Sequence, residues 1–251
     1  MMRSRRYRIV VAAVVAAMAL MVGAGAAQAV FPNFSGCATG GFCVDIQNRS
    51  GNLNIRGFNV PLHESLEIRG NLIPNGTDIP DFIPPAGTTG LFTRPEPVPG
   101  GLLGIEWIPG SSVLAITELA GPSSAIKIEP NNGRVRMPVK VRLVNLLLGM
   151  DCHIGTNSRP VMLDLITGTT SPPLPNRPIS GRRGVVGSIP GGFTLTGNTN
   201  VENSFAVPGA TECGLGLGLI NTLVNLKLGL PSAAGNNSIV LNNDVALAFV
   251  P

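Results

Sequence analysis

The chain has 251 residues, with 18 Lys and Arg against 14 Asp and Glu and a net charge of +4. Four of its arginines lie within the first eight residues, and without them 14 bases balance 14 acids. Net charge therefore gives no reason to expect nucleic acid or an anionic membrane as a partner. Aromatic residues are only 4% of the chain, so its core must consist mainly of Val, Ile and Leu, while 32 Gly and 22 Pro predict many turns.

Residues 1–29 have the three parts of a secretory signal peptide. Positive charges at Arg3 to Arg8 precede an apolar run from Ile9 to about Ala24, and Ala27-Gln28-Ala29 follows as a small-x-small cleavage signature. We predict cleavage after Ala29. The alternative is a membrane anchor, but the run of about 16 residues is shorter than the about 20 needed to span a bilayer. The sequence therefore predicts a secreted or envelope-associated protein without a stable membrane span, folded as one domain over residues 30–251.

All four cysteines follow this leader, at Cys37, Cys43, Cys152 and Cys213. An even number of cysteines in an exported chain predicts two disulfides, for which three connectivities exist. We favour Cys37–Cys43, around a short Gly-containing loop, and Cys152–Cys213, which closes a loop of about 60 residues. A metal site is the alternative, but the chain has no Cys-x-x-Cys and only two histidines, so we predict no metal and no cofactor.

Short runs of alternating apolar and polar residues, bounded by Gly, Pro and Asn, predict strands throughout the first half of the chain. They lie at Cys43–Asn48, Asn52–Val60, Glu64–Leu72, Leu102–Ile108, Ser112–Ala120 and Ala125–Glu129. The Pro-rich segment Pro74–Gly101 predicts a crossover loop over the sheet edge, with one short strand at Thr89–Thr93. A linker between domains is the alternative, although the apolar residues of this segment favour a packed loop.

The longest alternation lies at Arg134–Asn145, where one face is apolar and the other carries a basic row. Asn132-Gly133 before it is a strong hairpin signal and predicts that residues 125–129 pair with this strand. Further strands are predicted around Val161–Leu165, at Gly192–Asn198 and Ser204–Val207, and in two pieces on either side of Asn242-Asn243, with a second Pro-rich loop at Gly168–Gly184.

Helical spacing of apolar residues occurs within Thr211–Pro231, where Gly229 and Pro231 supply a stop signal. About ten short strands and one helix predict an all-β, mostly antiparallel fold. We expect a β-sandwich or a jelly-roll-like barrel with one short C-terminal helix.

The basic row consists of Arg134, Arg136, Lys140 and Arg142. On one strand face these side chains form a candidate site for an anionic polymer of the cell wall. The alternative, which we favour, is a solvated face whose charges pair across strands with acids such as Glu118 or Glu129.

Catalytic motifs are not evident. Gly-x-Ser-x-Gly is absent, and neither His63 nor His153 stands in a recognisable catalytic context, so both are interpreted as structural or surface residues. Glycoside hydrolysis needs two carboxylates about 5–10 Å apart. Pairs that fit this requirement by position are Glu64/Glu67, Asp78/Asp81 and Glu106/Glu118, each of which also fits a solvated strand face. No catalytic residue is assigned, and whether the protein is an enzyme stays open.

Three stretches of the C-terminal half, Cys152–Gly155, Leu165–Gly181 and Leu228–Asn237, carry a resemblance. Over about residues 140–240 the chain resembles uncharacterised secreted proteins of high-GC Gram-positive bacteria, the actinobacteria. The resemblance implies export and carries no activity or site residues with it.

The leading hypothesis from the sequence is a secreted, non-catalytic module that binds or builds the cell envelope, with a cell-wall polymer or another envelope protein as partner. A hydrolase of envelope glycans or esters is the first alternative. A β-barrel of an outer lipid layer is the second. The sequence leaves the oligomeric state open.

Overall fold

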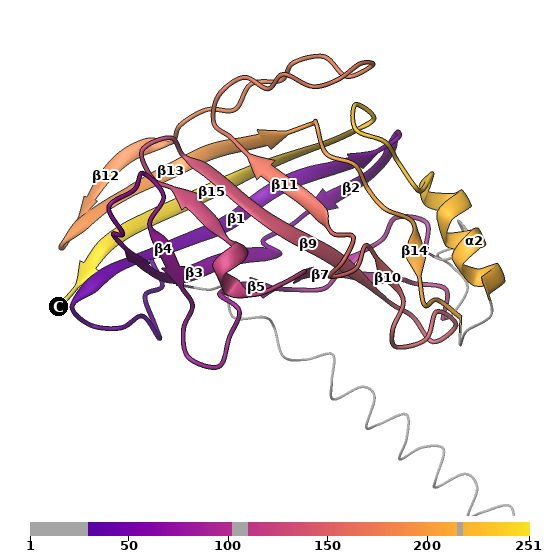
Figure 1. Ribbon diagram of the computed structural model, residues 1–251, viewed down its shortest axis with the longest axis horizontal. Helices are drawn as coiled ribbons and strands as arrows, with labels where there is room; N and C mark the ends of the chain where they lie inside the picture. Colours follow the sequence, from indigo (N-terminus) through magenta and orange to yellow (C-terminus); the bar gives the residue numbers. More distant parts are fainter. Residues whose placement is uncertain (1–29, 102–109, 215–217) are drawn as a thin grey trace, which may run out of the picture. The chain divides into compact units, whose positions relative to one another are not determined.

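The computed structural model describes residues 30–101, 110–214 and 218–251 (Figure 1). The predicted leader and the predicted strand at 102–108 lie outside the described residues. Contacts separate Met1–Phe31 from Pro32–Pro251, and the second of these units holds all the elements below. No helix among the described residues is long and apolar enough to cross a membrane.

Two antiparallel sheets make up this unit. The first has the order β12-β13-β15-β1-β3-β4, with β2 paired to β1 and β5 paired to β3. Its strands are β1 (Gly41–Ile55), β2 (Phe58–Leu62), β3 (Leu66–Ile73), β4 (Asp81–Ile83), β5 (Leu91–Thr93), β12 (Val185–Ile189), β13 (Gly192–Glu202) and β15 (Asn237–Val250).

The second sheet has the order β14-β10-β9-β7-β6, with β8 and β11 both paired to β9. Its strands are β6 (Glu96–Pro97), β7 (Leu114–Leu119), β8 (Lys127–Glu129), β9 (Arg134–Val144), β10 (His153–Ile154), β11 (Val161–Leu165) and β14 (Ala210–Thr211). A short 3-10 turn, η1 (Ser123–Ala125), and one α-helix, α2 (Gly218–Leu228), complete the described elements. Neither strand order returns to its first strand, so neither sheet closes into a barrel. The predicted all-β sandwich with one short helix is confirmed.

The predicted long strand is β9, and it is the centre of the second sheet. It pairs with β7, β8, β10 and β11 (Figure 1). The alternation has its expected effect, because Val135, Met137, Val139 and Leu143 are buried in the core shared by both sheets. The Asn-Gly hairpin is also confirmed, since β8 pairs with β9 across Gly133, whose φ of +61° suits glycine.

Strand continuity was the main error of the sequence predictions. The strand predicted to end at Asn48 continues as β1 to Ile55, with a bulge between Asn48 and Ser50. Gly51 lies within this continuous strand, at a point where β15 is too close to leave room for a side chain. A Cβ at Gly51 would lie 2.6 Å from the Val240 carbonyl oxygen. The two pieces predicted at the C-terminus are likewise one strand, β15.

Other predicted elements were displaced. Residues 204–207 form no strand, although Phe205 and Val207 are buried, and β12 lies where the sequence predicted no strand. The Pro-rich segment contains three short strands, β4, β5 and β6, rather than one. It crosses from one sheet to the other, and the Phe82 ring packs on β3, where a Cβ at Gly70 would lie 2.7 Å from it.

Both disulfides pair as predicted, Cys37 with Cys43 and Cys152 with Cys213. The first holds the N-terminal segment against β1. The second joins the start of β10 to the segment before α2. All four cysteines are thereby used.

The two disulfides should contribute unequally to stability. They span 61 residues for Cys152–Cys213 and 6 for Cys37–Cys43, so the entropy removed from the unfolded chain is larger for the former. Replacing both members with Ala should lower the free energy of unfolding by about 4 kcal/mol for the long loop and about 2 kcal/mol for the short one. Equilibrium unfolding in urea measures both, and equal losses or the reverse order would contradict the loop-length argument.

Candidate functional site

The basic row on β9 is paired with acids on three neighbouring strands. Arg134 donates from Nε and Nη2 to the two carboxylate oxygens of Asp164 on β11, at 2.6 and 2.5 Å. Arg136 donates from Nη2 to Glu129 Oε1 on β8, at 2.8 Å. Opposite charges that face each other across strands stabilise a sheet and neutralise its surface.

Glu118 on β7 accepts from the other half of the row. Arg142 Nε lies 2.6 Å from its Oε1, while Lys140 Nζ and His153 Nε2 lie 3.7 and 3.5 Å from its Oε2. Partial burial alone would raise the pKa of the Glu118 carboxyl, but the Arg142 hydrogen bond and the three nearby cations together hold that pKa below its usual range. The cross-strand alternative is thus confirmed for these residues, and binding of an anionic polymer stays a prediction.

No observation among the described residues brings the carboxylate pairs nominated for hydrolysis together, and the pair of Glu106 with Glu118 stays untested. Glu67 is engaged by Arg69 and Asn33, Asp78 and Asp81 are exposed, and Glu106 lies outside the described residues. His63 is largely exposed beside Glu96. Within the described part of the chain, no three His, Cys, Asp or Glu side chains gather closely enough to hold a metal ion.

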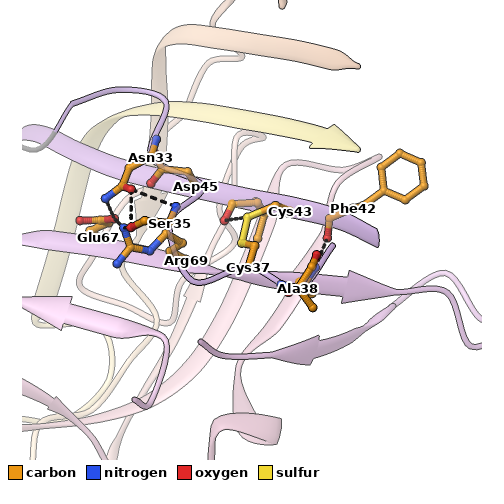
Figure 2. The surroundings of a disulfide bond; sticks show 11 residues. Asn33, Ser35, Cys37, Ala38, Phe42, Cys43, Asp45, Glu67 and Arg69 are labelled. Carbon is orange, nitrogen blue, oxygen red and sulfur yellow. Dashed lines mark hydrogen bonds and ion pairs between the residues drawn. A yellow bond between two sulfur atoms is a disulfide. The ribbon is translucent and has the colours of Figure 1, made fainter. Parts of the chain in front are cut away.

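A buried carboxyl that the sequence did not reveal is Asp45, on the outer face of β1 (Figure 2). Residues 33–38, tied down by the Cys37–Cys43 disulfide, cover it. The Asn33 backbone N–H donates to Asp45 Oδ2 at 2.6 Å, and Arg69 Nη1 donates to Ser35 Oγ at 2.9 Å (Figure 2). The side chain of Asp45 is fully buried and its Oδ1 has no hydrogen-bond partner.

Burial raises the pKa of Asp45 to about 7. The negative charge of Glu67 adds to this rise, while the hydrogen bonds from Asn33 and Gln47 and the charge of Arg69 oppose it. Asp45 lies on the outward face of β1, between the buried residues Val44 and Ile46. The segment 33–38, held by the Cys37–Cys43 disulfide, covers that face. In the sequence, only the neighbouring Cys43 indicates such a cover.

The space between the sheets is incompletely filled along the inward face of β9. Four cavities lined by described residues follow one another there, with volumes of about 40, 20, 100 and 20 Å³. Each shares a β9 residue with the next: Val135, then Met137, then Leu143. From Val135 to Leu143 the strand extends about 26 Å, at about 3.3 Å per residue. We call this series the β9 cavity row.

The largest cavity of the row is almost wholly apolar. Its wall on the β7 side is formed by Ala115 and Thr117, whose small side chains lie opposite Leu143 and Val141 of β9. Several lining residues, among them Leu62, are only partly buried although they belong to the core. Protein interiors normally contain few voids larger than a water molecule, so a row of cavities is a distinct feature of this fold.

Polar and charged residues also line the row: Arg94 and Glu96 at the largest cavity, Glu129 and Arg134 at one end, and Lys227 at the other. Asn48, Asn243 and Asn200 form a hydrogen-bonded chain across β1, β15 and β13, and Asn200 Nδ2 donates to the Gly133 carbonyl of the opposite sheet at 2.8 Å. Asn48 Oδ1 and Ser65 Oγ are buried, line the row and have no partner. Buried polar atoms normally find partners, so these two are available to a ligand's donor groups.

Comparison of the chain with protein-family models, with curated proteins and with solved structures found no match.

The buried Asp45 should make stability fall as the pH rises. The folded protein retains the Asp45 proton to about pH 7, whereas the unfolded chain releases it near 3.8, so folding is disfavoured progressively between these values. Asp45→Asn should remove this loss and gain up to about 4 kcal/mol over the parent protein between pH 4 and pH 8.

Chemical unfolding at a series of pH values measures this difference, and Asp81→Asn at an exposed position of β4 is the matched control. A stability difference between Asp45→Asn and the parent that does not change with pH would show that the carboxyl is already ionised throughout this range.

Proposed function

We propose that this protein is an exported, non-catalytic binding module of the cell envelope that holds the hydrocarbon part of a lipid between its two sheets. The β9 cavity row carries the proposal. Export is supported by the leader sequence and by two disulfides, which form under oxidising conditions. The resemblance to secreted actinobacterial proteins agrees with it.

The lining selects for an apolar ligand. A cavity of about 150 Å³ with Leu, Ile and Phe walls binds benzene, and the largest cavity here has about 100 Å³ with similar walls. A charged or strongly hydrated ligand would lose its hydration against these apolar walls, where Arg94 and Glu96 are the charged residues of the lining. Each methylene group that enters the row gains about 0.8 kcal/mol.

The arrangement of the cavities selects for an extended ligand. Because the four cavities follow one strand, a linear chain that lies along β9 contacts all of them, whereas a compact ring fills one. The unpartnered Ser65 Oγ and Asn48 Oδ1 lie in successive cavities of this row and can accept hydrogen bonds from hydroxyl groups on such a chain.

The hydrolase alternative lacks an observation in its favour. Asp45 has a pKa raised to about 7, but residues 33–38 cover it and it does not line the β9 cavity row. Of the carboxylates that do line the row, Glu96 accepts from the His63 backbone N–H and Glu129 accepts from Arg136, so both already have partners.

Filling the largest cavity should weaken ligand binding. We expect the protein to bind a dansyl-labelled fatty acid with a rise in dye fluorescence. Ala115→Phe places a ring in the cavity, and excluding two methylene groups of the ligand should weaken affinity by about tenfold or more. Fluorescence titration measures the dissociation constant of each protein.

Ile116→Phe is the matched control, because Ile116 lies on the same strand, opposite Arg142, and does not line the cavity. Its affinity should equal that of the parent protein. The proposal fails if the parent does not bind the fatty acid, or if Ala115→Phe binds it equally well while thermal unfolding shows both variants folded.

A further inference from the structure

The exposed face of the helix α2 is mostly apolar. Val224 and Leu228 are buried, yet Leu219, Leu223 and Leu226 are 77%, 50% and 79% exposed. A surface helix of a globular protein normally turns charged and polar residues to solvent. The single charged residue of α2 is Lys227, whose Nζ donates to the carbonyl oxygens of Gly100 and Gly101.

The loop after β9 adds a second exposed apolar segment. Leu146, Leu147 and Met150 are 91%, 63% and 77% exposed, while Leu148 between them is fully buried and anchors the loop. We call the six exposed residues the apolar end: Leu146, Leu147, Met150, Leu219, Leu223 and Leu226. Large exposed apolar patches mark surfaces that contact a membrane or another molecule.

The fold brings the two segments together. The Gly214 backbone N–H donates to the Leu148 carbonyl oxygen at 2.8 Å, and the Cys152–Cys213 disulfide joins the residues that follow the loop to those that precede α2. Leu148 and Val224 line the same small cavity. In Figure 1, α2 lies beside β10 and β14 at one end of the second sheet.

We propose that the apolar end inserts into the surface of a lipid layer, from which a hydrocarbon chain passes into the β9 cavity row. The choice of a lipid layer rests on continuity with the row, and to that extent on the proposed function. The cavity behind the apolar end is lined by Leu148, Leu143 and Leu228, and the last two also line the largest cavity. The residues that lie behind the apolar end thus also form a wall of the β9 cavity row.

The chemistry of the apolar end also determines how it docks. Its six residues carry no charge, and Lys227 is held by backbone carbonyls, so attraction to anionic headgroups contributes little. Insertion of leucine and methionine side chains is driven by burial of apolar area and does not weaken with salt. Docking through the basic row on β9 would instead weaken as salt rises.

The test is flotation of the purified protein with phosphatidylcholine vesicles at low and high salt. We expect the parent protein to float with the vesicles equally at both. Leu219→Gln/Leu226→Gln should reduce the vesicle-bound fraction by about tenfold or more, since glutamine keeps helix propensity while removing the apolar contacts. Leu146→Gln/Leu147→Gln should do the same without altering α2.

Leu174→Gln/Met162→Gln is the matched control, because these residues are 87% and 58% exposed elsewhere on the molecule. It should float like the parent. The inference is overturned if the parent does not float, if flotation is lost at high salt, or if the apolar-end variants float unchanged. A concentration-dependent dimer that these variants dissociate, without vesicle binding, would overturn it in favour of a second copy of the chain.

The docking surface and the cavity row are separable in the same experiments. Ala115→Phe should still float, because the apolar end is intact. The apolar-end variants should still bind the dansyl-labelled fatty acid from solution, because the row is intact. A parent protein that floats but does not bind the fatty acid contradicts the proposed function alone, and one that binds the fatty acid but does not float contradicts the docking surface alone.

Discussion

The alternation of β9 is the constraint on which the other features depend. Its inward residues form one wall of the cavity row, and its outward residues form the ion pairs with Asp164, Glu129 and Glu118. These acids come from three different strands that pair with β9. A slip of one residue would carry the arginines into the space between the sheets, so the register that opens a cavity row is also the register that neutralises the surface.

Polar groups within the core restrict how the two sheets meet. The asparagine chain of β1, β15 and β13 needs its partners, and Asn200 finds its own on the opposite sheet at Gly133. Buried polar networks cost stability when incomplete and favour one arrangement when satisfied. The core is therefore held at a set spacing while small side chains on β7 leave room inside it, which is the condition for a ligand space.

Local sequence information determined much of the fold. The antiparallel strands with strict alternation, the Asn-Gly hairpin, the helix near Gly229 and both disulfide pairings follow from patterns within short stretches or from the spacing of four cysteines. The face of each β9 side chain was predicted for the same reason, because a period of two assigns faces without knowledge of the partners. The breaks predicted between Asn48 and Asn52 and at Asn242-Asn243 were wrong, since the backbone there is paired with neighbouring strands and continues as β1 and β15.

Tertiary structure decided what covers each face and what remains open. Asp45 is buried because a disulfide folds residues 33–38 over β1. Leu219, Leu223 and Leu226 of α2 are exposed because the helix packs on the core through Ile220, Val224 and Leu228. The cavities of the row remain because the side chains of the two sheets do not fill the space that the sheets enclose. Alternation along a strand determines which residues face inward. It does not determine how far away the opposite wall stands, because that distance is set by residues far apart in the sequence.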